Sequence, residues 1–190
     1  RQALSHNEIE FSFVNNGEEI FYLKKESLKK RIISIFGEKI SQNLIPLNED
    51  TQIASLNGFI LKPDFAKKSR SNQYIFVNNR SVKSQFINHS IFSSFEGLLR
   101  DGYYPGYFLF INIDPTKIDV NVHPNKTEIK FDDDQNLYSI INSAVKHCLG
   151  IYQVTPVLDF ERDPSMDISY SQIETNPKIP NIEAVSYTHL

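Results

Sequence analysis

Apolar and polar positions alternate in two short runs near the start of the chain, at residues 8–14 and 19–23. The tripeptide Asn15-Asn16-Gly17 separates these runs, and an Asn-Gly pair favours a tight turn because both residues tolerate a positive φ. We therefore expect a β-hairpin. A helix should follow it, with Ser27 as its N-cap and Gly37 at its end. Its apolar face holds Leu28, Ile32, Ile35 and Phe36, and its other faces hold Lys29, Lys30 and Arg31.

The middle of the chain combines extended runs with one helical run. Residues 51–61 and 74–77 favour strands, the pair Asn78-Asn79 favours a turn, and residues 81–82 continue the extended run. Residues 107–113 are apolar nearly throughout, which is expected of a strand covered on both faces. Between these strands a helix is predicted from the helical spacing of Ile87, Ile91, Phe92, Phe95, Leu98 and Leu99.

The last part of the pattern completes the fold class. Residues 127–131 predict another strand, and residues 137–149 carry one apolar stripe of a final helix. The order of hairpin, helix, strand, strand–helix–strand, strand and helix is typical of the α+β class. We expect a two-layer sandwich in which a mixed or mostly antiparallel sheet has helices on one side. This domain should occupy residues 1–150.

After Gly150 the periodicity fades. Residues 151–190 mix four prolines with acidic and polar side chains, and such a segment buries too little apolar surface to fold. We expect a disordered linker there. Residues 185–190 resemble translated sequencing-adapter read-through, and we expect no function in them. Because the chain opens on Arg1 rather than on methionine, we expect a fragment of a longer protein.

Composition limits the compartment and the partners. The single cysteine, Cys148, excludes an internal disulfide framework and a cysteine-based zinc cluster, so a reducing cytoplasm is expected. No apolar run reaches the roughly 20 residues of a membrane span, and no signal-peptide pattern opens the chain, so we expect no membrane partner. The net charge of −3 is uneven, because residues 151–190 hold two basic and six acidic side chains.

One stretch of the chain, residues 65–95, contains no acidic side chain. A nucleic-acid partner could use such a stretch, because Lys and Arg neutralise phosphates. The alternative is a solvated loop and helix start that binds nothing. The candidate DNA-binding residues are Lys67, Lys68, Arg70, Arg80 and Lys83.

The sequence contains no self-contained active site, so we expect no ATP hydrolysis by the chain alone. It lacks a phosphate-binding G-x-x-x-x-G-K-[ST] loop and a dinucleotide-binding G-x-G-x-x-G motif. Its five histidines show no metal-ligand spacing, so we expect no metal site. Cys148 lies on the apolar stripe of the last helix, where packing explains it better than nucleophilic chemistry.

The most specific feature is the run Asn121-Val-His-Pro-Asn-Lys-Thr-Glu-Ile-Lys-Phe131. Pro124 fixes its own φ and biases His123 towards extended geometry, so Lys126 is presented from a defined backbone position. An ammonium held in this way suits contact with an anion, and phosphate is the usual one. Asn121 and His123 are expected to shape the loop through hydrogen bonds to the backbone.

This run resembles the Asn-Val-His-Pro-x-Lys-x-Glu-Val-x-Phe signature of MutL-type DNA mismatch-repair proteins. Phe76-Val-Asn-Asn-Arg-Ser-Val82 resembles the family's Phe-Val-Asn-Gly-Arg-x-Val motif, and Ile87-Asn-His-Ser-Ile91 resembles its helix start. Asn79 replaces the usual glycine, and asparagine is the next best residue for a left-handed turn. The resemblance covers residues 75–131, with a looser likeness back to Ile9.

The resemblance implies a transducer-type domain of ribosomal-protein-like fold with a left-handed strand–helix–strand crossover. It implies an upstream GHKL ATPase domain that binds ATP with Mg²⁺, and contact between Lys126 and the terminal phosphate. It also implies DNA binding, a homodimer formed through the amino-terminal region, the mismatch-recognition partner MutS, and a bacterial cytoplasm near the nucleoid. Gln85 stands where the family usually has a basic residue implicated in DNA contact, which leaves the charge to the candidates named above.

Two alternatives remain open. Transducer domains of type II topoisomerases share the fold and also offer a lysine to ATP, although their motif around that lysine differs from Asn-Val-His-Pro-x-Lys. The other alternative is a stand-alone nucleic-acid-binding module that resembles ribosomal and ribonuclease-P proteins. Such a module should be markedly basic throughout, whereas this chain has a net charge of −3.

Overall fold

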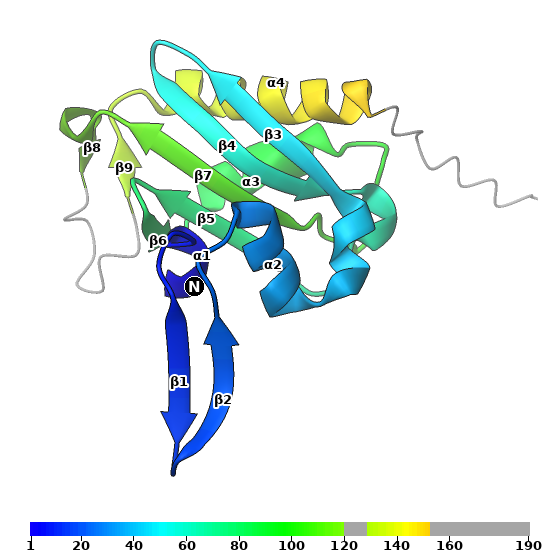
Figure 1. Cartoon of the computed structure of the whole chain (residues 1–190). Coiled ribbons are helices and arrows are strands. Elements are labelled where there is room, and N and C mark those ends of the chain that lie inside the picture. Colours follow the sequence, from blue (N-terminus) through cyan, green and yellow to red (C-terminus); the bar gives the residue numbers. More distant parts are fainter. Residues whose placement is uncertain (120–128, 153–190) are drawn as a thin grey trace, which may run out of the picture. The chain divides into compact units, whose positions relative to one another are not determined.

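The computed structural model describes residues 1–119 and 129–152 (Figure 1). A short helix, α1 (Gln2–Ser5), precedes a hairpin formed by β1 (Phe11–Asn15) and β2 (Glu18–Leu23). The strands pair antiparallel, and their turn places Asn16 at a φ of 52° and Gly17 at a φ of 82°. The predicted hairpin is confirmed, and its turn uses the positive φ values that Asn and Gly tolerate.

A five-stranded sheet of strand order β3-β4-β7-β5-β6 forms the centre of the domain. All neighbouring strands pair antiparallel except β5 and β7, which are parallel, so the sheet is mixed. The sequence pattern did not predict β3, which contains Pro46; proline is tolerated there because β3 is an edge strand. The strands are β3 (Leu44–Asp50), β4 (Ala54–Leu61), β5 (Gln73–Val77), β6 (Arg80–Val82) and β7 (Tyr107–Ile113).

The strand–helix–strand unit runs from β5 through β6 and α3 (Gln85–Ser94) to β7. The turn between β5 and β6 places Asn78 and Asn79 at φ values of 47° and 63°, so asparagine does serve in a left-handed turn here. α3 begins after Ser84, whose Oγ accepts a hydrogen bond from the backbone N–H of Ile87 at 3.2 Å. The left hand of this crossover stays a prediction.

Helices cover both faces of the sheet (Figure 1). α3 and α4 (Asp134–Ile151) pack on the face that buries Ile75 and Val77, whereas α1 and α2 (Leu28–Phe36) cover the face that buries Phe76, Phe108 and Phe110. The predicted sandwich had helices on one side of the sheet, and α3 and α4 form that layer. The prediction missed the layer that α1 and α2 form on the opposite face. A further layer forms because β5 and β7 bury apolar side chains on both of their sides, as the apolar run in β7 indicates.

Some side chains of the predicted helix faces lie elsewhere. Arg31, predicted on an outer face of α2, is completely buried at 0% exposure. Ile35 and Phe92, both predicted on apolar faces, are 38% and 46% exposed. α3 ends at Ser94, so Leu98–Leu99 pack on the core from the turns beyond the helix. Helical periodicity in the sequence predicts an apolar stripe, and this stripe is wider than the part of each helix that contacts the sheet.

The described chain is completed by η1 (Glu38–Asn43), η2 (Pro63–Phe65), η3 (Pro115–Lys117), β8 (Ile118–Asp119) and β9 (Lys130–Phe131). The strand predicted at residues 127–131 is confirmed in β9, and residues 127–128 lie outside the described part. Asp133 caps α4 by accepting a hydrogen bond from the backbone N–H of Asn136 at 3.2 Å. The predicted linker is also outside the description from residue 153 onwards, including residues 185–190, so its disorder stays a prediction.

Candidate functional site

The predicted phosphate-binding loop is anchored at both of its ends. β8 pairs with β9, so that Ile118 lies opposite Phe131 and Asp119 lies opposite Lys130. Phe131 is buried in the core that α4 helps to form. The loop between these strands therefore leaves and rejoins the domain at one fixed place. The residues predicted to act in it lie outside the described residues, and their roles stay predictions: Lys126, Asn121, His123 and Pro124.

The first part of the basic stretch lies against two tyrosines that precede β7. The backbone N–H of Tyr104 donates to the Lys67 carbonyl at 2.8 Å, and the Lys67 N–H donates to the Tyr104 carbonyl at 3.2 Å. The Lys68 Nζ lies 5.8 Å from the Tyr103 ring centroid, and the Arg70 Cζ lies 4.6 Å from the Tyr104 ring centroid. These cation–π contacts position two exposed cations on the surface.

Arg70 and Lys83 both line an open cleft of about 690 Å³, formed by β5, β6 and the start of α3. Among the residues that the structure describes, none of those lining this cleft is acidic. A neighbouring hollow of about 570 Å³ also has Arg70 in its wall. Cations that face a cleft without a neutralising carboxylate favour an anionic ligand. The other polar or charged side chains that line the cleft from outside β6 are Arg1, Gln73, Tyr74, Ser84, Gln85 and Asn88.

The other candidate DNA-binding residues do not line the cleft. Lys67, Lys68 and Arg80 are exposed on the surface outside it. Arg80 follows a turn in which the Asn78 side chain forms hydrogen bonds with the end of β7. The Asn78 Nδ2 donates to the Ile113 carbonyl at 2.9 Å, and the Ile113 N–H donates to the Asn78 Oδ1 at 3.0 Å. The sequence predicted this turn but not its anchor, because the partner is 35 residues away.

Gln85 is the first residue of α3, and its exposed side chain lines both the cleft and the neighbouring hollow. A helix start presents unpaired backbone N–H groups and the positive end of the helix dipole. Gln85 itself adds no charge. The cationic side chains of this cleft come instead from other segments of the chain, at Arg1, Arg70 and Lys83.

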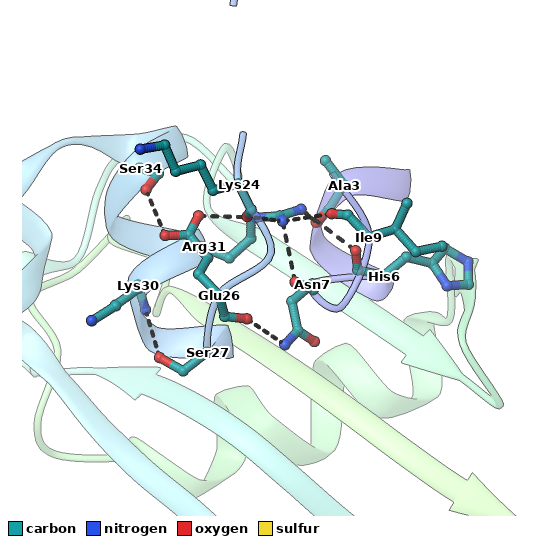
Figure 2. A network of polar contacts seen from close by, with 10 residues as sticks. All are labelled: Ala3, His6, Asn7, Ile9, Lys24, Glu26, Ser27, Lys30, Arg31 and Ser34. Atoms are coloured by element: carbon teal, nitrogen blue, oxygen red, sulfur yellow. Dashed lines mark hydrogen bonds and ion pairs between the residues drawn. The ribbon is translucent and has the colours of Figure 1, made fainter. Parts of the chain in front are cut away.

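A second polar cluster surrounds the buried side chain of Arg31 (Figure 2). The Arg31 Nε donates to the Glu26 Oε1 at 3.1 Å. The two terminal nitrogens donate at 2.6–3.5 Å to the carbonyls of Ala3, His6, Asn7, Ile9 and Lys24. These acceptors lie in α1 and on both sides of the hairpin. The cluster therefore ties the hairpin to α2, and we assign it a structural role.

The sequence carries a signal for the burial of Arg31, although not for its partners. Arg31 follows Leu28 by three residues and precedes Ile35 by four, so it shares the helical stripe of Ile32. Its charge led to the prediction of an outer position, because arginine is rarely buried without partners. The partners are backbone carbonyls brought together by the fold, and no sequence pattern marks them.

The ionisable groups of the described residues show no sign of nucleophilic or metal chemistry. Among residues 1–119 and 129–152, no three His, Cys, Asp or Glu side chains could hold one metal ion. The Cys148 Sγ lies 3.4 Å from the Pro46 carbonyl, and burial, with a smaller effect of Glu49, raises the pKa of this thiol. A thiol with a raised pKa is protonated near neutral pH and reacts slowly, which fits a packing role.

The hairpin presents a group of large apolar side chains to solvent. Phe13 and Phe21 stack across its strands, with ring centroids 5.7 Å apart. A two-stranded hairpin is marginally stable by itself in water, so this exposed apolar surface is a candidate for contact with another protein surface. Side chains that are 45–55% exposed here are Ile9, Phe13, Val14, Ile20, Phe21 and Tyr22.

Comparison with known proteins assigns this domain to a class of DNA repair proteins. The family described as "DNA mismatch repair protein, C-terminal domain" matches residues 32–150. A DNA mismatch repair protein MutL from Flavobacterium psychrophilum is 50% identical over 98% of this chain and 30% of its own length. Another from Christiangramia forsetii is 49% identical over 96% of this chain and 30% of its own length. The chain belongs to the MutL family of DNA mismatch repair proteins.

A solved structure supports the fold independently. It is described as the N-terminal domain of a DNA repair protein, and it matches 81% of this chain and 52% of its own length with a TM-score of 0.65. Its sequence identity of 21% makes it a likeness of fold alone. The chain spans about 30% of the length of its MutL relatives. In the part of the chain described, no helix is long and apolar enough to cross a membrane.

Proposed function

We propose that this chain binds DNA and completes the ATP site of an upstream GHKL ATPase domain in a bacterial mismatch repair protein. The observation that carries the DNA-binding part is the cleft beside α3, which Arg70 and Lys83 line and where no described lining residue is acidic. Both side chains are exposed, so phosphate contact requires little desolvation. Phosphate contacts are independent of sequence, and we therefore expect weak, sequence-tolerant binding.

The ATP part of the proposal is supported by the motif around Lys126 and by the anchored ends of its loop. The Lys126 ammonium would contact the terminal phosphate across the domain boundary. A unit charge about 4 Å from a phosphate oxygen contributes roughly 4 kcal/mol at an effective dielectric constant of about 20, before desolvation. A contact of this size biases the equilibrium between open and closed arrangements of two domains.

The remaining partners follow from the same scheme. The upstream domain would hold most of the ATP and its Mg²⁺. The exposed apolar hairpin supports a contact between this chain and a neighbouring domain. Closure would favour a homodimer of amino-terminal regions in the bacterial cytoplasm at the nucleoid, and the dimer would signal ATP occupancy to partners such as MutS.

The DNA-binding part is tested with the 190-residue chain and a fluorescent duplex, by anisotropy between about 50 and 200 mM salt. Changing both Arg70→Gln and Lys83→Gln removes two phosphate contacts. We expect weaker binding at every salt concentration and a slope of log K against log[salt] that is smaller by about 2. The matched control changes Lys29→Gln and Lys30→Gln, two exposed lysines of α2 that do not line the cleft.

The control pair should bind like the unmodified chain. An unmodified chain whose affinity does not fall as salt rises would refute phosphate binding. An equal loss in both double variants would show that binding depends on net charge rather than on this cleft.

A further inference from the structure

We propose that Asn88 donates a hydrogen bond to a DNA phosphate in the cleft, and that the buried Tyr107 holds the Asn88 amide in the orientation that this contact needs. This inference rests on the proposed DNA binding. It adds one uncharged binding residue and the residue that orients it, and neither is among the charged candidates named above. Tyr107 acts only through Asn88 and is therefore a positioning residue.

The first observation is the hydrogen bond between these two side chains. Tyr107 is the first residue of β7 and is 0% exposed, and its Oη donates to the Asn88 Oδ1 at 2.5 Å. Burial raises the pKa of the Tyr107 phenol, and the Arg70 guanidinium lowers it by a smaller amount. The hydroxyl therefore keeps its proton near neutral pH. A buried hydroxyl needs an acceptor, and the Asn88 oxygen is that acceptor.

The second observation is the orientation that this bond gives to the Asn88 amide. An asparagine side chain has one oxygen, which accepts hydrogen bonds, and one nitrogen, which donates two. In the part of the chain that the structure describes, no residue accepts a hydrogen bond from the Asn88 Nδ2. No buried side-chain nitrogen or oxygen there lacks a partner, so this Nδ2 is open to solvent. Tyr107 thus holds the oxygen and leaves the donor end of the amide free.

The third observation is the place of this free donor. Asn88 lines both the cleft of about 690 Å³ and the neighbouring hollow of about 570 Å³, and Arg70 lines the same two. The Arg70 Cζ lies 4.6 Å from the Tyr104 ring centroid, which positions the guanidinium. Its effect on the pKa of Tyr107 shows that it also lies near the residue that orients Asn88. A phosphate bound by Arg70 would therefore accept a second hydrogen bond from Asn88.

Gln73 has the opposite arrangement. It also lines both the cleft and the hollow, but its Nε2 donates to the Pro105 carbonyl at 3.1 Å. The end of this amide that is left for a ligand is its oxygen. Phosphate oxygens are acceptors as well, so Gln73 offers them nothing, whereas Asn88 offers a donor.

The contact is tested with the 190-residue chain and a fluorescent duplex, by anisotropy between about 50 and 200 mM salt. Asn88→Ala should weaken binding by about tenfold, because it removes a hydrogen bond to a charged group. The slope of log K against log[salt] should stay unchanged, since an uncharged donor releases no counterion. Arg70→Gln, in contrast, should reduce that slope by about 1.

The positioning role is tested by Tyr107→Phe, which removes only the hydroxyl. We expect binding to weaken by about threefold, because the Asn88 amide is then free to turn and must be ordered when the phosphate binds. A chain with both Asn88→Ala and Tyr107→Phe should bind like Asn88→Ala alone. Losses that multiply in the double variant would refute the positioning role.

A second variant covers the case in which Asn88→Ala does not fold, which circular dichroism detects. Asn88→Asp keeps an acceptor for the Tyr107 hydroxyl but replaces the free donor by a charged oxygen. It should weaken binding by more than Gln85→Glu, which adds the same charge at an exposed position of the same cleft. An equal loss in these two variants would contradict a direct contact of Asn88.

Asn112→Ala is the matched control, because Asn112 is an exposed asparagine of β7 that lines neither the cleft nor the hollow. It should leave the affinity unchanged. If Asn88→Ala folds and binds the duplex like the unmodified chain while steep salt dependence persists, the contact is refuted and the DNA-binding function stands. If the unmodified chain does not bind the duplex, the proposed function fails as well.

Discussion

Arg31 gathers backbone carbonyls from both sides of the hairpin, at Ala3–Ile9 before it and at Lys24 after it. A guanidinium presents five N–H donors in a planar fork, whereas a lysine ammonium presents three donors on one atom. Arginine therefore suits a site where carbonyls approach from several directions. Its complete burial means that removing it leaves acceptors without donors, which costs more than the hydrogen bonds contribute on balance.

Replacing this cation should destabilise the domain strongly. Arg31→Met is expected to lower the free energy of unfolding by about 3 kcal/mol or more, because it leaves the Glu26 carboxylate and several carbonyls unpaired. Arg31→Lys should recover only part of that loss. Urea unfolding followed by circular dichroism measures both values. Lys29→Met, at an exposed position on the same helix, is the control and should change the free energy by less than about 0.5 kcal/mol.

The positions of some residues could be predicted from their neighbours in the sequence, and those of others could not. The Ser27 cap and the left-handed Asn16 are specified by their immediate neighbours in the chain, and both were predicted. Arg31 and Phe92 were misplaced, because the burial of a helical side chain depends on what the rest of the fold brings to it. Arg70 was predicted as a DNA contact, but its pairing with Tyr104 could not be, since the two residues are far apart in sequence.

At the scale of elements, the close approach of β4 to β7 limits what position 58 can hold. Gly58 lies opposite Leu109 and has a φ of 136°, a conformation that side chains rarely adopt. A Cβ at this position would overlap the carbonyl oxygen of Phe108, which is backbone and cannot move aside. The spacing between β4 and β7 therefore depends on the absence of a side chain at position 58.

Gly58→Ala should destabilise the domain by about 3 kcal/mol, since it combines overpacking with backbone strain. Gly150→Ala is the matched comparison, because Gly150 lies in α4 with nothing within 4 Å of its Cβ position. There the same change should stabilise the domain by about 0.5 kcal/mol through helix propensity. Thermal unfolding of the two variants checks both signs. A similar effect of the two changes would contradict the steric explanation.

Most elements could be predicted from the sequence, whereas the way they pack could not. Periodicity identified the hairpin by its alternation of apolar and polar residues. It identified α2, α3 and α4 because each helix has its own N-cap and apolar face. The contact between α3 and α4 also uses a buried polar network that periodicity does not reveal. The Ser94 Oγ donates to the Ser90 carbonyl at 2.9 Å, and the Asn142 Nδ2 donates to the Ser94 Oγ at 3.0 Å.

At the scale of the whole molecule, the proposed role of Lys126 predicts an effect on catalysis without an effect on folding. In the longer protein, Lys126→Ala should lower the rate of ATP hydrolysis by at least about tenfold, because one charge-stabilising donor is lost. Lys146→Ala, at an exposed position on α4, is the control. Steady-state turnover measures the rates, and circular dichroism verifies the fold. Unchanged turnover in Lys126→Ala would contradict the proposed contact.

The family could be predicted because its motifs are contiguous in the chain. The cleft could not be predicted, because Arg70 and Lys83 line the same surface only after β5, β6 and α3 have packed together. The opposite helical layer was missed for a related reason. The apolar run of β7 indicates that both faces are covered, but it does not indicate which element covers the second face.

The hydrogen bonds of Arg31 also determine where the domain begins. The family match starts at residue 32, immediately after this arginine. Leu4 nevertheless shares an apolar core with Ile32, and the carbonyls of residues 3–9 accept hydrogen bonds from the guanidinium. A fragment cut at the family boundary would lose the cation, all of its acceptors and part of that core. At this end of the domain, the residues matched by the family model and the residues that fold together do not coincide.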